Sequence, residues 1–221
     1  LRADRKRDEA LAAVNAAQAA DPRSAAAHVL AGRIYAESDR IEDARREYEE
    51  SLKLDSRPII ADLELARIYL VSGDTDKALA FAQQALALQP QNPSVRAFLA
   101  RIYLRRGEES KAKPEIDALA KAFPNSATVM DLVALSQLAQ KQLPAARASY
   151  ERALKLDSTD LEAMTALVSL DMATGKSKEA IVRIEQVLAR KDPTVDVLLL
   201  AGRAYATVGN LEKTEALFRQ A

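Results

Sequence analysis

The chain has 221 residues, with 32 basic and 32 acidic side chains, so its formal net charge at pH 7 is zero. This balance excludes a whole-protein electrostatic attraction to nucleic acid or to an anionic membrane. The chain has no cysteine and one histidine, which excludes disulfides, thiolate chemistry and a metal site built from several such ligands.

Residues 1–22 are predicted to form one helix that lacks its partner. Ala10, Val14 and Ala17 share a helical face, and the Asp21-Pro22 pair ends the pattern. The segment has neither an initiator methionine nor the pattern of a signal peptide, so we expect its first residue to be a processing boundary. No apolar run approaches the ~20 residues that span a bilayer.

Residues 59–92 show most clearly the unit from which the chain is built. The first half, 59–70, is apolar on most sides, which indicates a helix packed on more than one face. Gly73 then suits a left-handed helix end, Asp74 a helix N-cap, and Pro90 the end of the second helix. The second helix has one apolar face, made of Ala78, Phe81, Ala82, Ala85 and Leu86. The unit is therefore a helical hairpin that needs neighbours to cover it.

The same features recur every 34 residues. A small residue in the second (outer) helix runs through Ala10, Ala44, Ala78, Ala112, Ala146 and Ala180. In the first (inner) helix, a tyrosine recurs as Tyr35, Tyr69, Tyr103 and Tyr205, with Gln137 and Asp171 in the two intervening units. This period predicts full repeats at 25–58, 59–92, 93–126, 127–160 and 161–194, and a partial repeat at 195–221. We expect a single stack over 1–221.

Two prolines and one capping pattern lead to specific local predictions. Pro114 falls inside the expected outer helix of repeat 93–126, so that helix either begins late, near Lys111, or is kinked. Thr159 and Glu162 have the spacing of a capping box and are expected to fix the start of the inner helix of repeat 161–194. Pro144 lies in a first helical turn, where proline is tolerated.

The repeat resembles the tetratricopeptide repeat (TPR) family over almost the whole chain. The matching residues are Gly32, Tyr35, Ala44, Tyr48 and Leu54 in repeat 25–58, and Leu65, Ala66, Tyr69, Ala78, Ala85 and Pro90 in repeat 59–92. The family's inner-helix tryptophan is absent. The resemblance implies an all-α, right-handed α-solenoid of about six repeats with a leading half repeat. It also implies that the inner helices line a concave groove where a ligand binds.

Catalysis is not expected in this segment. The single histidine, His28, lies at an inner-helix packing position, and each glycine is used by the repeat, so no phosphate-binding loop remains. Neighbouring carboxylates fall on outer-helix faces or turns and are interpreted as solvated charges. No cofactor and no metal are predicted.

One inner-helix position, two residues before the repeat tyrosine, is the strongest candidate for ligand contact. It holds arginine in the first three repeats, and Arg105 shares the face of Arg101. These arginines meet carboxylates of a partner, or they pair with Glu37, Asp62 or Glu64 of this chain. The predicted groove is basic in its first half and apolar in its second. It is lined by Arg33, Arg67, Arg101, Arg105, Leu135, Leu138, Ser169, Met172 and Arg203.

The leading functional hypothesis is a protein-interaction scaffold that holds a partner segment with acidic groups in this groove. One alternative is binding of an anionic polysaccharide, because the sequence resembles bacterial TPR proteins of envelope assembly and exopolysaccharide export. Another is a structural spacer that self-associates through uncapped ends. A bacterial periplasm or envelope and the cytoplasm both remain open as locations.

Overall fold

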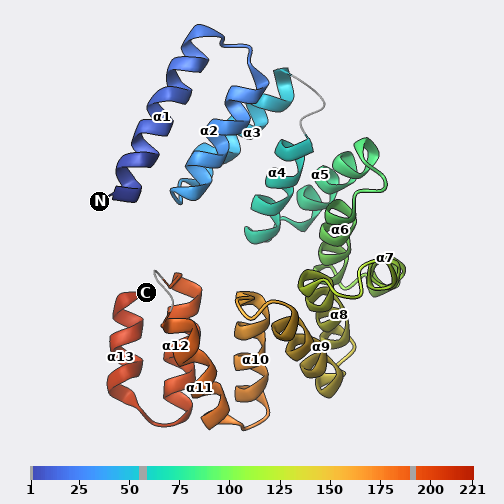
Figure 1. Ribbon diagram of the computed structural model, residues 1–221, viewed down its shortest axis with the longest axis vertical. Helices are drawn as coiled ribbons and strands as arrows, with labels where there is room; N and C mark the ends of the chain where they lie inside the picture. Colours follow the sequence, from blue (N-terminus) through green and yellow to red (C-terminus); the bar gives the residue numbers. More distant parts are fainter. Residues whose placement is uncertain (1, 55–58, 190–192) are drawn as a thin grey trace. The chain divides into compact units, whose positions relative to one another are not determined.

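The computed structural model describes residues 2–54, 59–189 and 193–221, with side chains from residue 9 onward. These residues form thirteen α-helices and no strand (Figure 1). The all-α prediction is therefore confirmed. The helices are α1 (Arg2–Ala20), α2 (Ala25–Glu37), α3 (Ile41–Leu54), α4 (Ile59–Val71), α5 (Thr75–Leu88), α6 (Pro93–Arg105), α7 (Glu109–Ala122), α8 (Ala127–Ala139), α9 (Leu143–Leu156), α10 (Leu161–Ala173), α11 (Ser177–Leu188), α12 (Val195–Thr207) and α13 (Leu211–Gln220).

The helix boundaries follow the 34-residue period. Inner helices begin at residues 25, 59, 93, 127, 161 and 195, and outer helices begin at 41, 75, 109, 143, 177 and 211. The residue before an inner helix caps it in every repeat where that residue is described. These caps are Ser24, Asn92, Ser126, Asp160 and Thr194, and the side chain of each accepts a hydrogen bond from a backbone N–H of the first turn.

The turn between inner and outer helix has one fixed conformation. Gly73 has a φ of 86°, and three further glycines at 34-residue intervals also have positive φ. Asp39 and Lys141 occupy the same position in the other two turns and take a φ of 58°. The turn therefore requires the left-handed conformation in all six repeats, even where the residue is not glycine.

The inner and outer helices of a repeat pack through small residues. Ala44, Ala78, Ala112, Ala146 and Ala180 are fully buried, as the period predicts for the helix crossing. Gly32 also permits a close approach, because a Cβ at that position would lie 2.7 Å from the ring of Tyr48. The ring of Tyr48 is itself 1% exposed.

The tertiary contacts divide the chain into two compact units, residues 1–106 and 107–221. Unit 1 holds α1 to α6 and unit 2 holds α7 to α13. A core cluster in unit 1 is centred on Leu65, Tyr69 and Leu99, and one in unit 2 on Val168, Ile184 and Tyr205. The single stack over the whole chain stays a prediction, and each unit is described by itself.

The local structure departs from the sequence-based expectations in three places. Of the two alternatives for the outer helix of repeat 93–126, the late start is wrong, because α7 starts at Glu109, in register, and continues through Pro114. The kink stays a prediction. The inner helix of repeat 161–194, α10, is capped by Asp160, whose side chain accepts from the N–H of Ala163, whereas Thr159 bonds to Asp157. The capping box assigned to Thr159 and Glu162 is therefore one residue out of place.

The face that α1 presents to α2 also differs from the expectation. Ala10 and Ala17 are exposed, and the packing is made by Val14, which is 4% exposed, with the partly buried Leu11. Gln18 on the same helix donates a hydrogen bond to Glu47 of α3. The predicted extent of α1 and its end before Asp21 are confirmed.

Candidate functional site: grooves beside the inner helices

Two of the repeat tyrosines donate a hydrogen bond to a carboxylate of the preceding outer helix. Tyr69 donates a hydrogen bond to Glu49 at 3.0 Å, and Tyr205 donates to Glu185 at 2.8 Å. The ammonium group of Lys213 lies 4.5 Å from the centre of the Tyr205 ring and also donates to Glu185. These bonds hold successive repeats together and orient the inner helices.

The same tyrosine position also contacts the residue twelve positions later, in the outer helix of its own repeat. The rings of Tyr69 and Phe81 stack, with centroids 5.7 Å apart. In the two repeats that lack this tyrosine, the residue in its place forms a hydrogen bond with the residue twelve positions later. Ser149 donates to Gln137 at 2.7 Å, and Arg183 donates to Asp171 at 2.9 Å.

Asp171 makes the most deeply buried ionic contact among the described residues. Its side chain is fully buried and accepts from Arg147 at 2.6 Å and from Arg183 at 2.9 Å. Glu151 lies near both arginines, at 4.0 and 3.8 Å. Two guanidinium groups thus compensate the carboxylate at a position where other repeats place a tyrosine. The network ties together α9, α10 and α11.

His28 has a structural environment. Its Nδ1 lies 2.8 Å from Glu47 Oε2 and 3.0 Å from the amide nitrogen of Gln18, so it joins α1, α2 and α3. No group of three or more histidine, cysteine, aspartate or glutamate side chains within the described part of the chain is arranged to hold a metal ion.

Unit 1 contains a cavity of about 540 Å³ between the α2–α3 hairpin and α4. Its apolar wall includes Ile41, Ile68 and Val71. Its charged lining residues are paired, because Glu42 binds Arg45 and Glu64 lies 3.4 Å from Arg67. The arginine and glutamate side chains therefore largely offset one another, so this part of the groove is less basic than the arginine pattern predicts.

The predicted arginine positions differ in exposure. Arg33, Arg67, Arg105 and Arg203 are exposed, and Arg101 is half-buried. The side chain of Arg67 is 63% exposed, and its guanidinium group lies 5.8 Å from the ring centre of Phe98. Arg67 is the member of this set that lines a described cavity.

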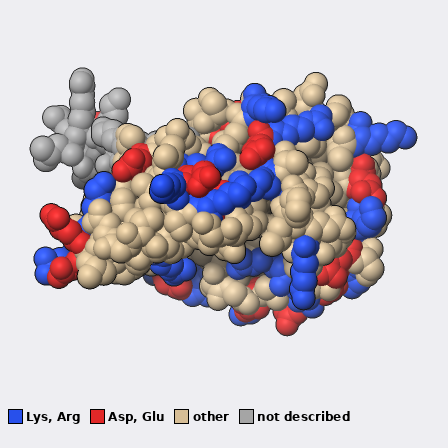
Figure 2. Space-filling model, turned by 90° about the horizontal axis from the view of Figure 1, so that it is seen from below, with Lys and Arg blue, Asp and Glu red and all other residues tan. Residues whose placement is uncertain are grey.

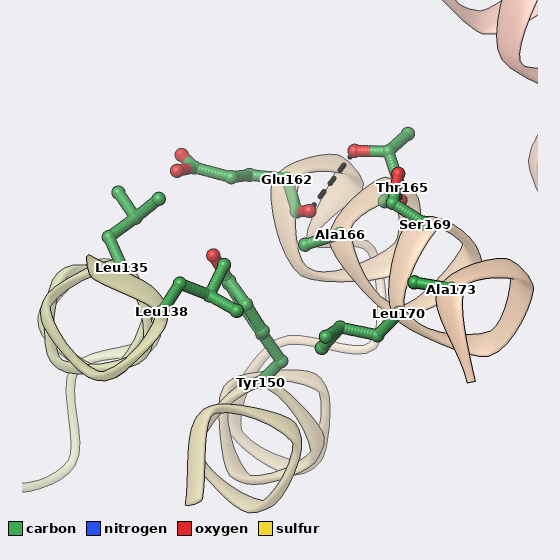
Figure 3. A pocket seen from close by; sticks show the side chains of 9 residues that line it. All are labelled: Leu135, Leu138, Tyr150, Glu162, Thr165, Ala166, Ser169, Leu170 and Ala173. Atoms are coloured by element: carbon green, nitrogen blue, oxygen red, sulfur yellow. Dashed lines mark hydrogen bonds between the residues drawn. The ribbon is translucent and has the colours of Figure 1, made fainter. Parts of the chain in front are cut away.

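Unit 2 contains a cavity of about 460 Å³ between α8 and α10, with Tyr150 of α9 pointing into it (Figure 3). Of the residues predicted for the apolar half, Leu135, Leu138 and Ser169 line this cavity. Met172 does not line it and packs against the core cluster around Val168. A helix turns by about 100° per residue, so the neighbouring Ala173 faces the cavity in its place.

A further cavity of about 400 Å³ lies between α10 and α12, and it shares Glu162 and Thr165 with the first. Sequence reasoning missed Glu162, Thr165 and Asp196 as lining residues. Glu162 and Asp196 are 34 residues apart and occupy the same position of the inner helix. Comparing that position across the repeats would have found both. We call the two cavities together the unit-2 groove.

The repeated helical hairpins, their fixed turns and the grooves beside the inner helices define a helical-repeat protein. Two family models, each described as tetratricopeptide repeat, match the chain: one over residues 69–135 and 137–194, the other over residues 1–58 and 37–93. The chain therefore belongs to the tetratricopeptide repeat family. No curated protein sequence matches it significantly.

Solved structures show the same fold at low sequence identity. A tetratricopeptide repeat protein from Parabacteroides merdae is 18% identical to this chain, with a TM-score of 0.75. The match covers 97% of this chain and 85% of that protein. A TPR protein from Thermus thermophilus is 21% identical, with a TM-score of 0.72. The match covers 84% of this chain and 99% of that protein. YrrB, described as a TPR protein with an unusual peptide-binding site, is 16% identical, with a TM-score of 0.55. The match covers 93% of this chain and 88% of YrrB.

Proposed function

We propose that this chain is a scaffold that holds a segment of a partner protein against its inner helices. The tetratricopeptide repeat is a protein-interaction fold whose members are typically not enzymes. The observation that carries the proposal is the unit-2 groove, where Leu135, Leu138 and Ala166 line an open, mostly apolar cavity. Such a surface suits the aliphatic side chains of a peptide. YrrB, the similar TPR protein with an unusual peptide-binding site, supports the same function.

The exposed arginines of unit 1 add a second contact in this proposal. Arg33 and Arg67 project from the inner helices α2 and α4, one repeat apart. They would meet acidic groups of a partner protein, and this attraction would weaken as salt rises. Because Arg67 is exposed, Arg67→Glu should change the free energy of unfolding by no more than ~1 kcal/mol. An effect of that variant on binding can therefore be separated from an effect on folding.

A random 16-residue peptide library displayed on phage tests the proposal. We expect the chain to enrich peptides whose binding is lost in Ser169→Trp, which fills the groove, and in Leu138→Asp, which makes its wall polar. Ser158→Trp, in the loop between α9 and α10 and outside the lining, is the matched control and should keep binding. Failure to enrich any peptide that depends on the groove would contradict the proposal. Specific retention of an anionic polysaccharide, lost in Arg33→Glu and Arg67→Glu, would favour the polysaccharide alternative.

A further inference from the structure

The cavity of about 540 Å³ between the α2–α3 hairpin and α4, which we call the unit-1 cavity, can be compared with the same place one repeat later. Three of its lining positions recur 34 residues further along the chain with different side chains. The pairs are Ile41 and Thr75, Glu42 and Asp76, and Ser72 and Arg106. The largest change in size is at the last pair, where a serine in one repeat corresponds to an arginine in the next.

The side chain of Arg106 connects these positions in the later repeat. Arg106 directly follows α6, and its Nη1 donates a hydrogen bond to Thr75 Oγ1 at 3.4 Å and pairs with the carboxylate of Asp76. Thr75 and Asp76 are the first two residues of α5. The side chain of Arg106 is 23% exposed, although that of Asp76 is 87% exposed. In that repeat an arginine therefore crosses the space that stays open in the unit-1 cavity, where Ser72 is too short to reach across it.

The unit-1 cavity keeps the groups that an arginine side chain requires. Ile41, Ile68 and Val71 supply an apolar wall, against which the methylene groups of an arginine can pack. Glu42 places a carboxylate at the position of Asp76. Glu42 already pairs with Arg45, but a carboxylate has two oxygens and can accept hydrogen bonds from a second guanidinium group.

Unit 2 shows that one carboxylate of this protein can bind two arginines. Asp171 accepts from Arg147 at 2.6 Å and from Arg183 at 2.9 Å, through different oxygens. The pairing of Glu42 with Arg45 therefore does not prevent it from binding the arginine of a partner.

The charges around the unit-1 cavity favour a cation. Three carboxylates and two guanidinium groups line it or contact its lining residues: Glu42, Glu49, Glu64, Arg45 and Arg67. Lys77 lies 4.9 Å from the ring centre of Tyr69 and is balanced by Asp74 at 3.0 Å. The molecule as a whole gives no such preference, because its net charge is zero and both kinds of charge are interspersed over the face shown in Figure 2.

We infer that the unit-1 cavity binds an arginine side chain of a partner protein, in the way that Arg106 occupies the same place one repeat later. The methylene groups would lie against Ile68 and Val71, and the guanidinium group would reach Glu42. Arginine suits this site better than lysine, because its planar guanidinium group can bind a carboxylate through two donors. The inference rests on the proposed function only for the source of the arginine, since its site lies in unit 1.

Titration with the capped amino acid Nα-acetyl-arginine-N-methylamide at constant ionic strength tests this inference. We expect saturable changes in the NMR signals of the backbone amides of Ile41, Glu42 and Ser72, with a dissociation constant of about millimolar order. The corresponding citrulline compound has nearly the same shape but no charge. It should bind about tenfold more weakly, because a hydrogen bond to a charged group is stronger than one between neutral groups.

Two variants with matched controls identify the site. Ser72→Arg supplies the chain's own arginine and should abolish binding of the probe, whereas Ser94→Arg adds the same charge at an exposed residue of α6 outside the lining and should keep it. Glu42→Gln tests the same site without adding a side chain and should weaken binding about tenfold. Glu50→Gln, on the same helix but outside the lining, should weaken binding by less than about threefold.

The outcomes separate this inference from the proposed function. Equal binding of the arginine and citrulline compounds, unchanged binding in Ser72→Arg, or no saturable change at up to ~50 mM probe overturns the inference. The scaffold proposal then still stands, because its test depends on Ser169 in unit 2. Conversely, saturable binding that is lost in both Ser72→Arg and Glu42→Gln supports the arginine site, even if no phage-selected peptide depends on Ser169.

Discussion

Lys141 shows how strongly the repeat imposes its turn on individual residues. It takes a φ of 58° at a position where four other repeats have glycine. A lysine in the left-handed region is strained relative to glycine, so Lys141→Gly should stabilise the protein by about 1 kcal/mol. Chemical denaturation measures the change. Gly73→Ala is the converse substitution and should destabilise by a similar amount, and a loss of stability in Lys141→Gly would contradict this account.

Asp62 is a buried carboxyl group in unit 1 whose environment favours its neutral form. It is 2% exposed, its Oδ1 has no hydrogen-bond partner among the described residues, and burial raises its pKa to about 6. The native state therefore binds a proton more tightly than the unfolded state does. Ionisation of Asp62 costs stability increasingly as the pH rises from about 4 through 6.

Asp62→Asn should accordingly stabilise the protein at neutral pH. We expect a gain of about 1–2 kcal/mol at pH 7.5 that disappears below pH 4, where the carboxyl group is neutral in both states. Denaturation measured at both pH values checks the prediction. Asp117→Asn, at an exposed residue of α7, is the control and should show no such gain at pH 7.5. A gain for Asp62→Asn that does not depend on pH would show that ionisation is not the cause.

At the scale of a helix, Pro114 interrupts the backbone hydrogen bonding of α7. α7 starts in register and continues through it, so the carbonyl of Ser110 loses the N–H that would bind it. Pro114→Ala should stabilise by about 1–3 kcal/mol and slow amide exchange around Pro114. Pro144, in the first turn of α9, is the matched control, and Pro144→Ala should change stability by less than ~0.5 kcal/mol. Equal effects of the two substitutions would contradict this reasoning.

The Asp171 network is the principal ionic contact between helices in unit 2. Asp171→Ala removes the partner of both Arg147 and Arg183 and should cost about 2–4 kcal/mol. Glu151→Ala removes a carboxylate that is 45% exposed and more distant, so it should cost less than ~1 kcal/mol. Thermal and chemical denaturation of both variants compare the two. A similar cost for the two substitutions would show that burial of Asp171 does not set the strength of the network.

At the scale of the whole molecule, stability should be a sum of local terms. Ala78→Leu overpacks a fully buried helix crossing in unit 1 and should cost about 1–3 kcal/mol. Ala78 lies in unit 1 and Asp171 in unit 2. The double variant Ala78→Leu, Asp171→Ala should therefore lose the sum of the two single costs within ~0.5 kcal/mol. A coupling energy above ~1 kcal/mol in this double-mutant cycle would show that the two units respond as one.

The helix boundaries could be predicted almost to the residue because the same helical hairpin recurs every 34 residues. The starts of the inner helices at residues 25, 59, 93, 127 and 161 follow from the period alone. The turn at Lys141 did not follow from its own side chain, since lysine gives no sign of a left-handed conformation. It becomes visible only when the position is compared with Gly73 and its counterparts.

The candidate site was less predictable, because a groove is formed by several positions of the repeat together. Following the position of Arg33 and Arg67 through the repeats led to Leu135 and Ser169, which line a cavity of the unit-2 groove. That they bind a ligand stays a prediction. Following this one position missed the carboxylates of Glu162 and Asp196, which come from another face position of the same helices. The sequence offered Glu64 as one of several partners for Arg67, but it could not select that pair, because the contact depends on side-chain placement.

The matched pairs twelve residues apart determine how this protein can be recombined. Tyr69 with Phe81, Gln137 with Ser149 and Asp171 with Arg183 each lie within one hairpin. A chimera that joins the inner helix of one hairpin to the outer helix of another would place a charge against a ring or an amide. Transplanting an entire hairpin keeps its internal pair. The hairpin that contains Asp171, however, must be transplanted together with the preceding hairpin, because Arg147 lies in that preceding hairpin. The smallest segment that can be exchanged there is therefore two hairpins long.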